Sequence, residues 1–503
     1  MNQVSRVGFN VYQGRIAIQE RSWKPNHIIL KYLLPSIFLV ASFAAAGVSA
    51  QTDEQARAFA RMADEAAEEE AYAMGIDAYL YGYPRVEMAR RMHNEMHRVR
   101  EDQVIYAPVN RFYYFDRLAR PGDGRVIKAP NNDTLYGSAY LDLSAGPVIL
   151  RVPSMGERYY VALVVDAAGN VNTRISRTVS GPGGVDYVFA GPGYRGTVPA
   201  GAQVLQQTAN DLWLLMRVAS TGGDDEAAAA QILKRFTLRE FDQAPGAPAV
   251  GANYPVDDLP VTEPLEPFNG LGFFSVLDHM IARNPVPADY QGLLLRWQRI
   301  GLGSGRYDPD GLMPPVRRGL ERAIVAAERI VVAAQFGIAN NVNGWNYSDK
   351  IGRIRNDWAL NAAIARGGYG NLAEDSVYHQ RSLDDNGQPL TGEREYTMTF
   401  AQGKLPPVGS FWSITAYDQN SFDLIENPIG RYSFGDRTKG VVRNSDGSLT
   451  IAIRHDAPKD PILRANWLPV GEGPFYLIIR TYDPAPEIAA GTWAPPPVIR
   501  IDD

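Results

Sequence analysis

Apolar and polar residues follow two different spacings along this chain of 503 residues. Between Thr52 and Arg100 the apolar positions recur at the spacing of a helix, and we predict a helix that Gly82 and Pro84 interrupt. From residue 106 to residue 221 the spacing is that of strands, in the runs VILRV, YYVALVV, YVFAG and LWLLMRV. Because YYVALVV is apolar at both odd and even positions, we expect that strand to be covered on both faces.

The second half of the chain repeats the change from helix to strand. Alanine-rich residues 226–241 predict a helix, and the prolines between 245 and 267 predict an irregular crossing or domain boundary. Residues 272–300 and 315–338 return to helical spacing. Strand patterns resume between residues 394 and 482 in YTMTF, FWSITAY, LTIAI and FYLIIRTY. The tail WAPPPVIRI predicts extended chain.

Short stretches of the two strand-rich regions resemble each other. RYYVALVVD (158–166) is similar to SFWSITAYD (410–418), and LWLLMRV (212–218) is similar to FYLIIRT (475–481). The alternating run LYGSAYLDL begins the first region, and EYTMTFAQG begins the second. We therefore predict two β-domains built on one plan, with helices before and between them.

These patterns divide the chain into six segments. They are a signal peptide (1–50), an N-terminal helical segment (51–104), a first β-sandwich domain (105–242), a proline-rich linker (243–270), a helical insertion (271–368) and a second β-sandwich domain (369–503). The predicted fold class is α+β, and mainly β.

The first fifty residues have the features of a secretory leader. Five basic residues precede an apolar run from Leu33 to Ala46, and small residues follow up to Ala50. The run contains Pro35 and is shorter than the roughly 20 residues that a spanning helix requires. We predict cleavage after Ala50, no stable membrane span afterwards, and a periplasmic or secreted protein.

Composition limits the partners of the protein. Cleavage would remove five basic residues and one acidic residue, which lowers the formal net charge from −6 to −10. An acidic surface repels phosphate backbones, so we expect no nucleic-acid partner. The chain has no cysteine, which excludes disulfides, thiolate metal sites and cysteine nucleophiles. We expect no cofactor, and the oligomeric state stays open.

Several separated motifs resemble a known bacterial family. AYLYGYPRVEM, PNNDTLYGSAYLDLS and RYYVALVVDAAGN are similar to the domain of unknown function 1254. GSFWSITAYD, NPIGRYSFGDRT, DGSLTIAI and GPFYLIIRTYDP are similar to its usual partner, the domain of unknown function 1214. The resemblance covers nearly the whole chain after the leader. It implies an exported two-domain protein of jelly-roll-like β-sandwich architecture with a helical insertion, and it implies no particular activity.

The polar run after Pro130 is the first candidate site. Asn131, Asn132 and Asp133 can each accept from main-chain N–H groups two residues ahead, so one interpretation is a turn that starts a strand. The other interpretation is functional. Amide and carboxylate groups at the end of a strand, next to the ring of Tyr136, offer donors, acceptors and a stacking surface to a polar ligand.

Other aromatic and charged residues suit the same kind of flat, polar ligand, although core packing accounts for most tryptophans. The candidate ligand-binding residues are Asn131, Asn132, Thr134, Tyr136, Trp345, Trp412, Arg431 and Tyr432. If the protein is an enzyme, carboxylates carry the acid–base chemistry, because no G-x-S-x-G motif occurs. The candidate catalytic residues are Asp133, Asp418 and Asp436.

Two arginines on otherwise apolar strands need partners if they are buried. Asp166 with Arg217, and Asp418 with Arg480, are predicted to form one structural ion pair in each β-domain.

Two further motifs are weaker. HNEMH places His93 and His97 four residues apart on a helix but brings no third ligand, so we predict a solvated helix face and no metal. SLDDNGQPLTGE (382–393) partly matches an EF-hand loop, but it has Ser382 at the first position and no flanking helices. A hairpin turn is the preferred interpretation of that stretch.

Three functions remain open at this stage. The preferred one is an exported protein that binds a small or carbohydrate-like ligand in a cleft near the Asn131–Tyr136 turn and the domain junction. The second is a periplasmic hydrolase or lyase that uses Asp133 with a second carboxylate. The third is a structural envelope protein.

Overall fold

The computed structural model describes residues 49–97, 103–241, 270–353 and 356–501. All but the last two residues of the predicted signal peptide lie outside the described residues, as does nearly all of the predicted linker. The chain divides into two units, residues 1–65 and 66–503. The described part of the first unit is the beginning of helix α2 (Ser49–Met96), and the other described elements belong to the second unit. No helix within the described ranges is long and apolar enough to cross a bilayer.

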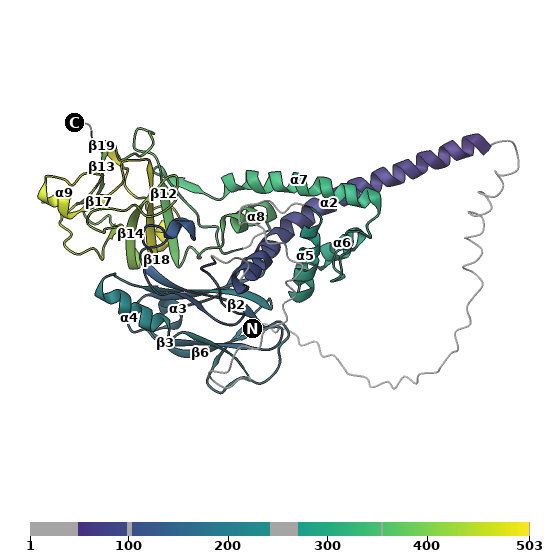
Figure 1. Ribbon diagram of the computed structural model, residues 1–503, viewed down its shortest axis with the longest axis horizontal. Coiled ribbons are helices and arrows are strands. Elements are labelled where there is room, and N and C mark those ends of the chain that lie inside the picture. The colour runs from purple at the N-terminus through teal and green to yellow at the C-terminus, as the bar shows by residue number, and fades with distance from the viewer. Residues whose placement is uncertain (1–48, 98–102, 242–269, 354–355, 502–503) are drawn as a thin grey trace, which may run out of the picture. The chain divides into compact units, whose positions relative to one another are not determined.

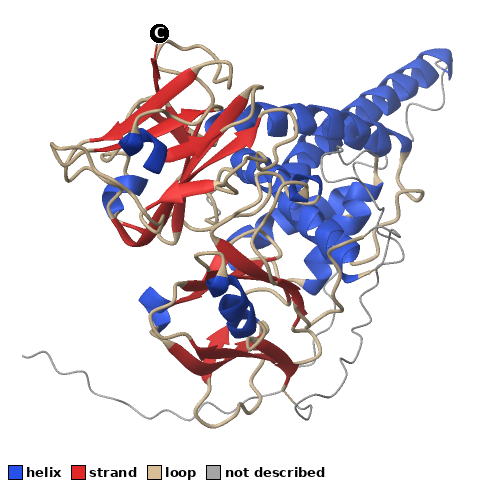
Figure 2. Ribbon diagram, turned by 60° about the vertical axis from the view of Figure 1, so that its left-hand side comes forward, coloured by secondary structure: helices blue, strands red, loops and turns tan. Residues whose placement is uncertain are grey.

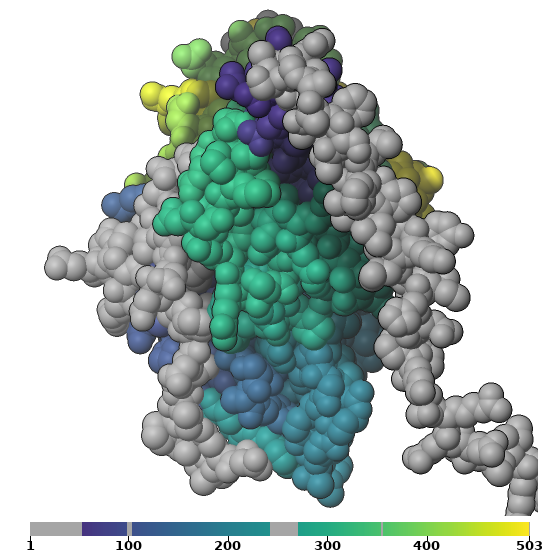
Figure 3. Space-filling view, turned by 90° about the vertical axis from the view of Figure 1, so that its right-hand side faces the viewer, coloured from purple at the N-terminus to yellow at the C-terminus, as the bar shows by residue number. Residues whose placement is uncertain are grey.

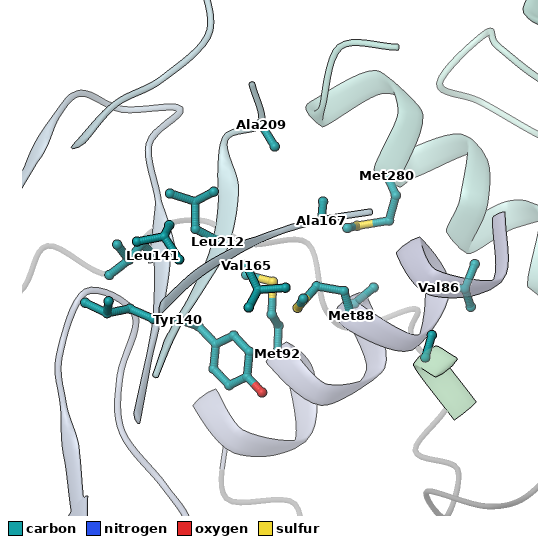
Figure 4. Close-up of a cluster of buried hydrophobic side chains, with 14 of the residues drawn as sticks. Val86, Met88, Met92, Tyr140, Leu141, Val165, Ala167, Ala209, Leu212 and Met280 are labelled. Carbon is teal, nitrogen blue, oxygen red and sulfur yellow. The ribbon is translucent and has the colours of Figure 1, made fainter. Parts of the chain in front are cut away.

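Helix α2 confirms the predicted N-terminal helix but continues through Gly82 and Pro84. The predicted interruption is therefore wrong. Met88 and Met92 are fully buried and lie against Tyr140 and Val165 of the first β region, as Figure 4 shows. The burial of this face of α2 stabilises the helix by more than the roughly 3 kcal/mol that a proline costs inside a helix.

Four more helices confirm the predicted helical segment. They are α5 (Gly272–Arg283), α6 (Gln291–Trp297), α7 (Pro314–Ala334) and α8 (Trp358–Gly367). They join the same hydrophobic core as α2 and the first β region. Residues of this segment, coloured teal to green, form the middle of the face seen in Figure 3.

The first β region contains a five-stranded sheet in the order β1-β2-β8-β4-β5 and a four-stranded sheet in the order β7-β6-β3-β9. The strands are β1 (Tyr113–Phe115), β2 (Thr134–Asp142), β3 (Val148–Ser154), β4 (Tyr160–Asp166), β5 (Val171–Ser176), β6 (Gly183–Ala190), β7 (Gln203–Gln206), β8 (Asp211–Ala219) and β9 (Thr237–Glu240). Every residue of β4 is buried, which confirms that this strand is covered on both faces.

The prediction of one helix over residues 226–241 is wrong in its second half. Helix α4 (Asp224–Leu233) ends early, and Thr237–Glu240 forms β9 instead. Strand β9 pairs with β3, so the hydrogen bonds of a sheet edge override the helical composition of this stretch. Three short helices also lie in the second unit's β regions: α3 (Arg177–Ser180), α9 (Pro461–Ala465) and α10 (Pro486–Ala489).

The second β region contains a six-stranded sheet in the order β10-β11-β12-β18-β14-β15 and a four-stranded sheet in the order β17-β16-β13-β19. The strands are β10 (Asn340–Val342), β11 (Trp345–Tyr347), β12 (Ser376–Arg381), β13 (Glu395–Phe400), β14 (Val408–Asp418), β15 (Ser433–Gly435), β16 (Leu449–Arg454), β17 (Trp467–Pro469), β18 (Phe475–Pro484) and β19 (Ile499–Ile501). Figure 2 shows the strands in two groups, one for each region. The described chain is therefore a mixed α+β protein.

The two β regions have the same strand order, which agrees with the predicted common plan. Strands β2, β8 and β4 occupy the places of β12, β18 and β14, and the pairs β6–β7 and β16–β17 are both parallel. Arg217 lies opposite Val161, and Arg480 lies opposite Ser413, in the same relative register. One proposed match is wrong, because EYTMTF forms β13, the counterpart of β3. The counterpart of β2 is β12, SVYHQR.

The larger sheets of the two regions meet, and we call this contact the junction. Tyr159, Val161, Leu163 and Ala219 of the first region share a buried cluster with Phe411 and Tyr482 of the second. The ring of Tyr159 lies edge-on to both Phe411 and Tyr482, at centroid distances of 5.5 and 5.4 Å. The junction therefore has an apolar component as well as the polar contacts described below.

The burial of His379, on β12 of the second β region, has a consequence for stability that can be measured. It is fully buried, stacks on Tyr347, and has no hydrogen-bond partner on either ring nitrogen. Burial lowers the pKa of His379 from 6.5 to about 4. Since the unfolded chain binds a proton near pH 6.5 and the folded chain does not, this residue makes stability fall as the pH drops from 6.5 to 4, by about 3 kcal/mol.

Denaturant unfolding at several pH values should show this effect as a difference between the wild type and His379→Phe. Titrating groups that both proteins share cancel in that difference. The wild type should lose stability relative to the variant as the pH falls from 6.5 to 4. A difference that stays constant with pH would contradict the buried, neutral state of His379.

Candidate functional site

The polar run after Pro130 forms a turn and also crosses the junction. The side-chain oxygen of Asn131 accepts from the main-chain N–H of Asp133 at 2.7 Å, as the turn interpretation requires. The amide nitrogen of Asn131 donates to the Tyr482 hydroxyl at 2.8 Å, and that of Asn132 donates to the Ala119 carbonyl at 2.7 Å. The Asn131 amide therefore links the two β regions, whereas the Asn132 amide bonds within the first region.

Asp133 is the most heavily bonded residue of this turn. Its Oδ2 accepts from the Ser413 hydroxyl at 2.6 Å and the Tyr482 hydroxyl at 3.0 Å. Its Oδ1 pairs with Arg437 at 3.4 Å, and its residue exposure is 2%. All three partners belong to the second β region. A buried carboxylate with three partners fits a bridge between the regions, and this contradicts its predicted role as a solvent-facing acid or base.

The other candidate catalytic residues do not complete a carboxylate pair with Asp133. Asp418 accepts from the main-chain N–H groups of Asn420 and Ser421, and so shapes a turn. It lies five residues beyond Ser413 along β14, which corresponds to about 16 Å. This exceeds the roughly 5–10 Å that hydrolytic carboxylate pairs span, so the pairing of Asp133 with Asp418 is wrong.

Asp436 lies nearer to Asp133. It accepts from the main-chain N–H of Trp412 at 3.2 Å, and burial raises the pKa of its carboxyl, with a smaller contribution from the charge of Asp133. Arg437, which pairs with Asp133, follows it in the chain. Asp436 therefore belongs to the edge of the junction.

Most of the predicted ligand contacts serve packing. Trp345 and Trp412 lie in the core of the second β region, and Thr134 is buried at the start of β2. Arg431 donates to the carbonyls of Ala465 and Trp467, and Tyr432 packs against the buried cluster around Tyr417. Of the predicted set, Tyr136 alone lies beside Arg217, with 5.1 Å between the guanidinium carbon and the ring centroid.

The predicted ion pairs of Arg217 and Arg480 do not form. In both sheets the aspartate lies five residues along the strand from the position opposite the arginine, or about 16 Å away. Asp166 accepts instead from the N–H groups of Ala168 and Asn170. No salt bridge within the described ranges involves either arginine, whereas Arg437 pairs with Asp133 and Arg174 with Asp375.

Arg217 and Arg480 lie together in the junction with tyrosines around them, and we call this group the arginine–tyrosine cluster (Arg217, Arg480, Tyr136, Tyr378 and Tyr417). Arg217 lies opposite Tyr136 on β2, and Arg480 lies opposite Tyr378 on β12, in matching positions of the two sheets. The distance from guanidinium carbon to ring centroid is 5.1 Å in both pairs. Arg217 also donates to the Tyr378 hydroxyl across the junction, at 2.6 Å.

Several donors of the cluster are buried without a partner. These are Nε of Arg217 and both Nε and Nη1 of Arg480, whose Nη2 donates to the Ala129 carbonyl at 3.1 Å. The two arginine residues are only 7% and 2% exposed. A buried, unpaired donor costs about 1–3 kcal/mol and more when it is charged, so these N–H groups require an explanation.

The cluster also shifts the ionisation of its tyrosines. Burial opposes the charge of Arg217, but the surrounding hydroxyls, Tyr136 and Tyr378 first, raise the pKa of its guanidinium. Burial likewise opposes the phenolate of Tyr378, yet Arg217 and then Arg480 outweigh it and lower the pKa of Tyr378. The pKa values of Tyr136 and Tyr417 are raised by burial. Both guanidinium groups also act on Tyr136, and Tyr378 differs from Tyr136 in accepting a hydrogen bond from Arg217.

The residues of the cluster differ in their burial. Tyr136 and Tyr378 are half-buried, although the arginines beside them are buried. Two cavities of about 560 and 540 Å³ lie elsewhere, the first beside Asp384 and the second beside Tyr72 and Arg322. Neither is lined by the Asn131–Tyr136 turn, and a cleft near that turn stays a prediction.

Sequence reasoning missed Tyr378, which bonds to Arg217. The stretch DSVY (375–378) has the same place in the second β region as DTLY (133–136) has in the first. Matching these two stretches would have placed Tyr378 opposite Arg480, as Tyr136 is opposite Arg217. The signal is short, and the incorrect match of EYTMTF with β2 obscured it.

Fold and site define a mixed α+β protein in which two matching β regions enclose a charged junction. Residues 109–240 match the family described as protein of unknown function (DUF1254), and residues 375–486 match protein of unknown function (DUF1214). The chain therefore belongs to the proteins that carry these two domains. The first match covers the first β region from before β1, and the second extends from Asp375 through β18.

One solved structure supports the fold. The crystal structure of the VPA0106 protein from Vibrio parahaemolyticus is 23% identical and has a TM-score of 0.69. The alignment covers 86% of this chain and 100% of that one, and it shows the fold alone. An uncharacterized protein from Burkholderia cenocepacia is 12% identical with a TM-score of 0.39, over 88% of this chain and 95% of that one. No curated protein matches the chain.

The bridge formed by Asp133 leads to a stability prediction. Asp133→Ala leaves Ser413, Tyr482 and Arg437 without their shared acceptor, and we expect a loss of about 3 kcal/mol or more in the free energy of unfolding. Asp186→Ala is the matched control, because Asp186 pairs with Arg151 at 3.0 Å on the surface. That change should cost about 1 kcal/mol or less. Equal losses in urea unfolding would show that Asp133 does not bridge the regions.

Proposed function

We propose that this protein is exported and binds a small organic anion at the arginine–tyrosine cluster, between two jelly-roll-like β-sandwiches. The leader pattern before Ala50 and the absence of cysteine support export. The arrangement of each region in two sheets around one core supports the sandwich description. The observation that carries the binding proposal is the pair of buried guanidinium groups with unpaired N–H donors.

The charge of the cluster favours an anionic ligand. Among the described residues no salt bridge joins Arg217 or Arg480 to a carboxylate, whereas Arg174 and Arg437 of the junction each pair with one. Burying a charge without a counter-ion is costly, and a carboxylate or phosphate group would both neutralise it and accept the unpaired N–H groups. A neutral carbohydrate could accept some of those hydrogen bonds but would leave the charge uncompensated.

The surroundings suit a small ligand with an apolar or aromatic part. Tyr136 and Tyr378 are half-buried as residues, and their rings lie beside the guanidinium groups, where they would offer a flat contact to a ligand. Asn371 completes the polar lining, because its side-chain oxygen accepts from Arg217 once its amide is turned to satisfy both groups. We therefore favour a monocarboxylate or a small phosphate ester over an extended polymer.

A second candidate function is proton abstraction from such a ligand, as in a lyase. The observation that favours it is the hydrogen bond from Arg217 to Tyr378, combined with the charge of Arg480 over the same ring. Both stabilise a phenolate, which can act as a general base. In this version Tyr378 takes the role that the carboxylate hypothesis gave to Asp133.

A thermal-shift series tests the binding proposal. Acetate, benzoate, succinate and inorganic phosphate are compared with glucose as a neutral reference, for the wild type and for Arg480→Met. We expect at least one anion to raise the unfolding temperature of the wild type and none to raise that of the variant. The ligand-free variant should lose no stability, because a hydrophobic residue replaces a buried unpaired charge.

Arg443→Met is the matched control, since Arg443 is an exposed arginine of the second β region that donates to the Gly447 carbonyl. It should keep the anion response. Stabilisation by glucose as large as that by the anions would contradict the proposal, as would a response that survives in Arg480→Met. A strongly destabilised Arg480→Met with no anion response in the wild type would instead support a structural role for the junction.

The ionisation of Tyr378 is tested by near-ultraviolet absorbance, which detects phenolates. On raising the pH, the folded wild type should form one phenolate earlier than an ordinary tyrosine, and Tyr378→Phe should abolish that step. Tyr114→Phe is the control, because burial raises the pKa of Tyr114 to about 12 and its removal should leave the early step unchanged. A bound anion should delay the step, since it neutralises the two arginines. An early step that persists in Tyr378→Phe would refute the assignment.

A further inference from the structure

A second site lies in the other part of the second β region, away from the junction. A cavity of about 560 Å³ is formed by the β10–β11 hairpin, the turn at residues 382–387 and Pro497. The turn is the stretch that partly matches an EF-hand loop. The lining of the cavity contains amides, carboxylates and one guanidinium group. They belong to Asn341, Asn343, Asn346, Arg381, Asp384 and Asp385.

The floor of the cavity is rigid. Arg381 donates to the carbonyls of Leu383, Asn343 and Asp384 at 2.5, 2.8 and 2.8 Å, which ties the hairpin to the turn. Gly344 has a φ of +77°, and a Cβ there would lie 2.7 Å from Nη1 of Arg381. The Asn343–Gly344 turn therefore allows the arginine to approach, and the three asparagines stay on the rim.

The floor of the cavity contains a carboxylate oxygen of Asp384 that can accept a further hydrogen bond. Its Oδ1 accepts from the main-chain N–H groups of Asn386 and Gln388, at 2.9 and 2.8 Å. Its Oδ2 is buried and has no partner, and the residue is 2% exposed. A buried carboxylate oxygen without a donor is costly, and a ligand O–H group would supply that donor.

We propose that this cavity binds a neutral carbohydrate, with Asp384 accepting from its hydroxyl groups and the rim asparagines bonding to others. Leu383 and Pro497 supply apolar contact for the C–H face of a sugar ring. A metal ion fits less well, because the guanidinium group of Arg381 lies in the floor and no group of three or more acidic or histidine ligands occurs in the described part of the chain. An anion is disfavoured by the two carboxylates.

The proposal is tested by titration calorimetry with glucose, galactose, mannose, N-acetylglucosamine and their disaccharides, and separately with calcium chloride. We expect at least one saccharide to bind. Asp384→Asn should weaken its affinity by about tenfold or more, because the amide nitrogen can no longer accept. Asn346→Ala, an exposed rim change that leaves the floor intact, should also weaken binding. Asn386→Ala, on the same turn but outside the lining, should leave it unchanged.

Several results would overturn this assignment. One is the absence of binding by every saccharide, and another is saccharide binding that neither Asp384→Asn nor Asn346→Ala affects. Calcium binding without saccharide binding, lost in Asp384→Asn, would identify a cation site instead. If Asp384→Asn does not fold, Asn346→Ala decides alone. Because the junction is not part of this cavity, the result is independent of anion binding there.

Discussion

Two guanidinium groups buried between two β-sheets are the constraint on which the functional account depends. Transferring a charge from water into a protein interior is expensive, and proteins usually compensate it with a carboxylate. Arg217 and Arg480 have tyrosine hydroxyls, a main-chain carbonyl and an amide around them instead, and three of their N–H groups have no partner. An arrangement of this kind is better explained by a ligand that brings a negative charge than by stability.

The repeated plan of the two β regions explains why the arginines meet. Each occupies the same position in the larger sheet of its region, opposite a tyrosine on the neighbouring strand. Because the two larger sheets meet at the junction, the two arginines lie near each other, and both positive charges act on the same site. Asp133 and Asp375 stand one residue before the two corresponding strands, and each pairs with an arginine of the other region. The junction thus combines two arginines in salt bridges, which hold the regions together, with two that form no salt bridge in the described ranges, although the charge of Asp133 acts on Arg480.

Periodicity predicted most of the elements because helices and strands bury one or both faces at a characteristic spacing. It identified the long N-terminal helix, the helical segment and the strands β4, β8, β14 and β18. It failed where contacts with residues far away in the sequence determine the local structure. Pro84 stays helical, and Thr237–Glu240 forms a strand by pairing with β3. The apolar pattern of one strand does not show which other strand it pairs with.

The site was harder to predict for the same reason. The pairing of Asp166 with Arg217 looked plausible in sequence, but the register of β4 and β8 separates them by five residues. The sequence singled out Asp133 as a candidate acid or base, but its partners Ser413, Tyr482 and Arg437 lie about 280 to 350 residues away along the chain. Only the contact between the two sheets shows that Asp133 bridges them and that Arg217 and Arg480 have buried donors without a hydrogen-bond partner among the described residues.

The most direct test of this account is anomalous diffraction from crystals of the protein grown with bromide. Bromide is a small anion that needs no specific shape, so it reports where uncompensated positive charge can be reached. The account predicts a bromide ion bonded to the unpaired N–H groups of Arg217 and Arg480, beside Tyr378. A junction that contains only water or side chains, with bromide bound solely at the outer surface, would contradict it.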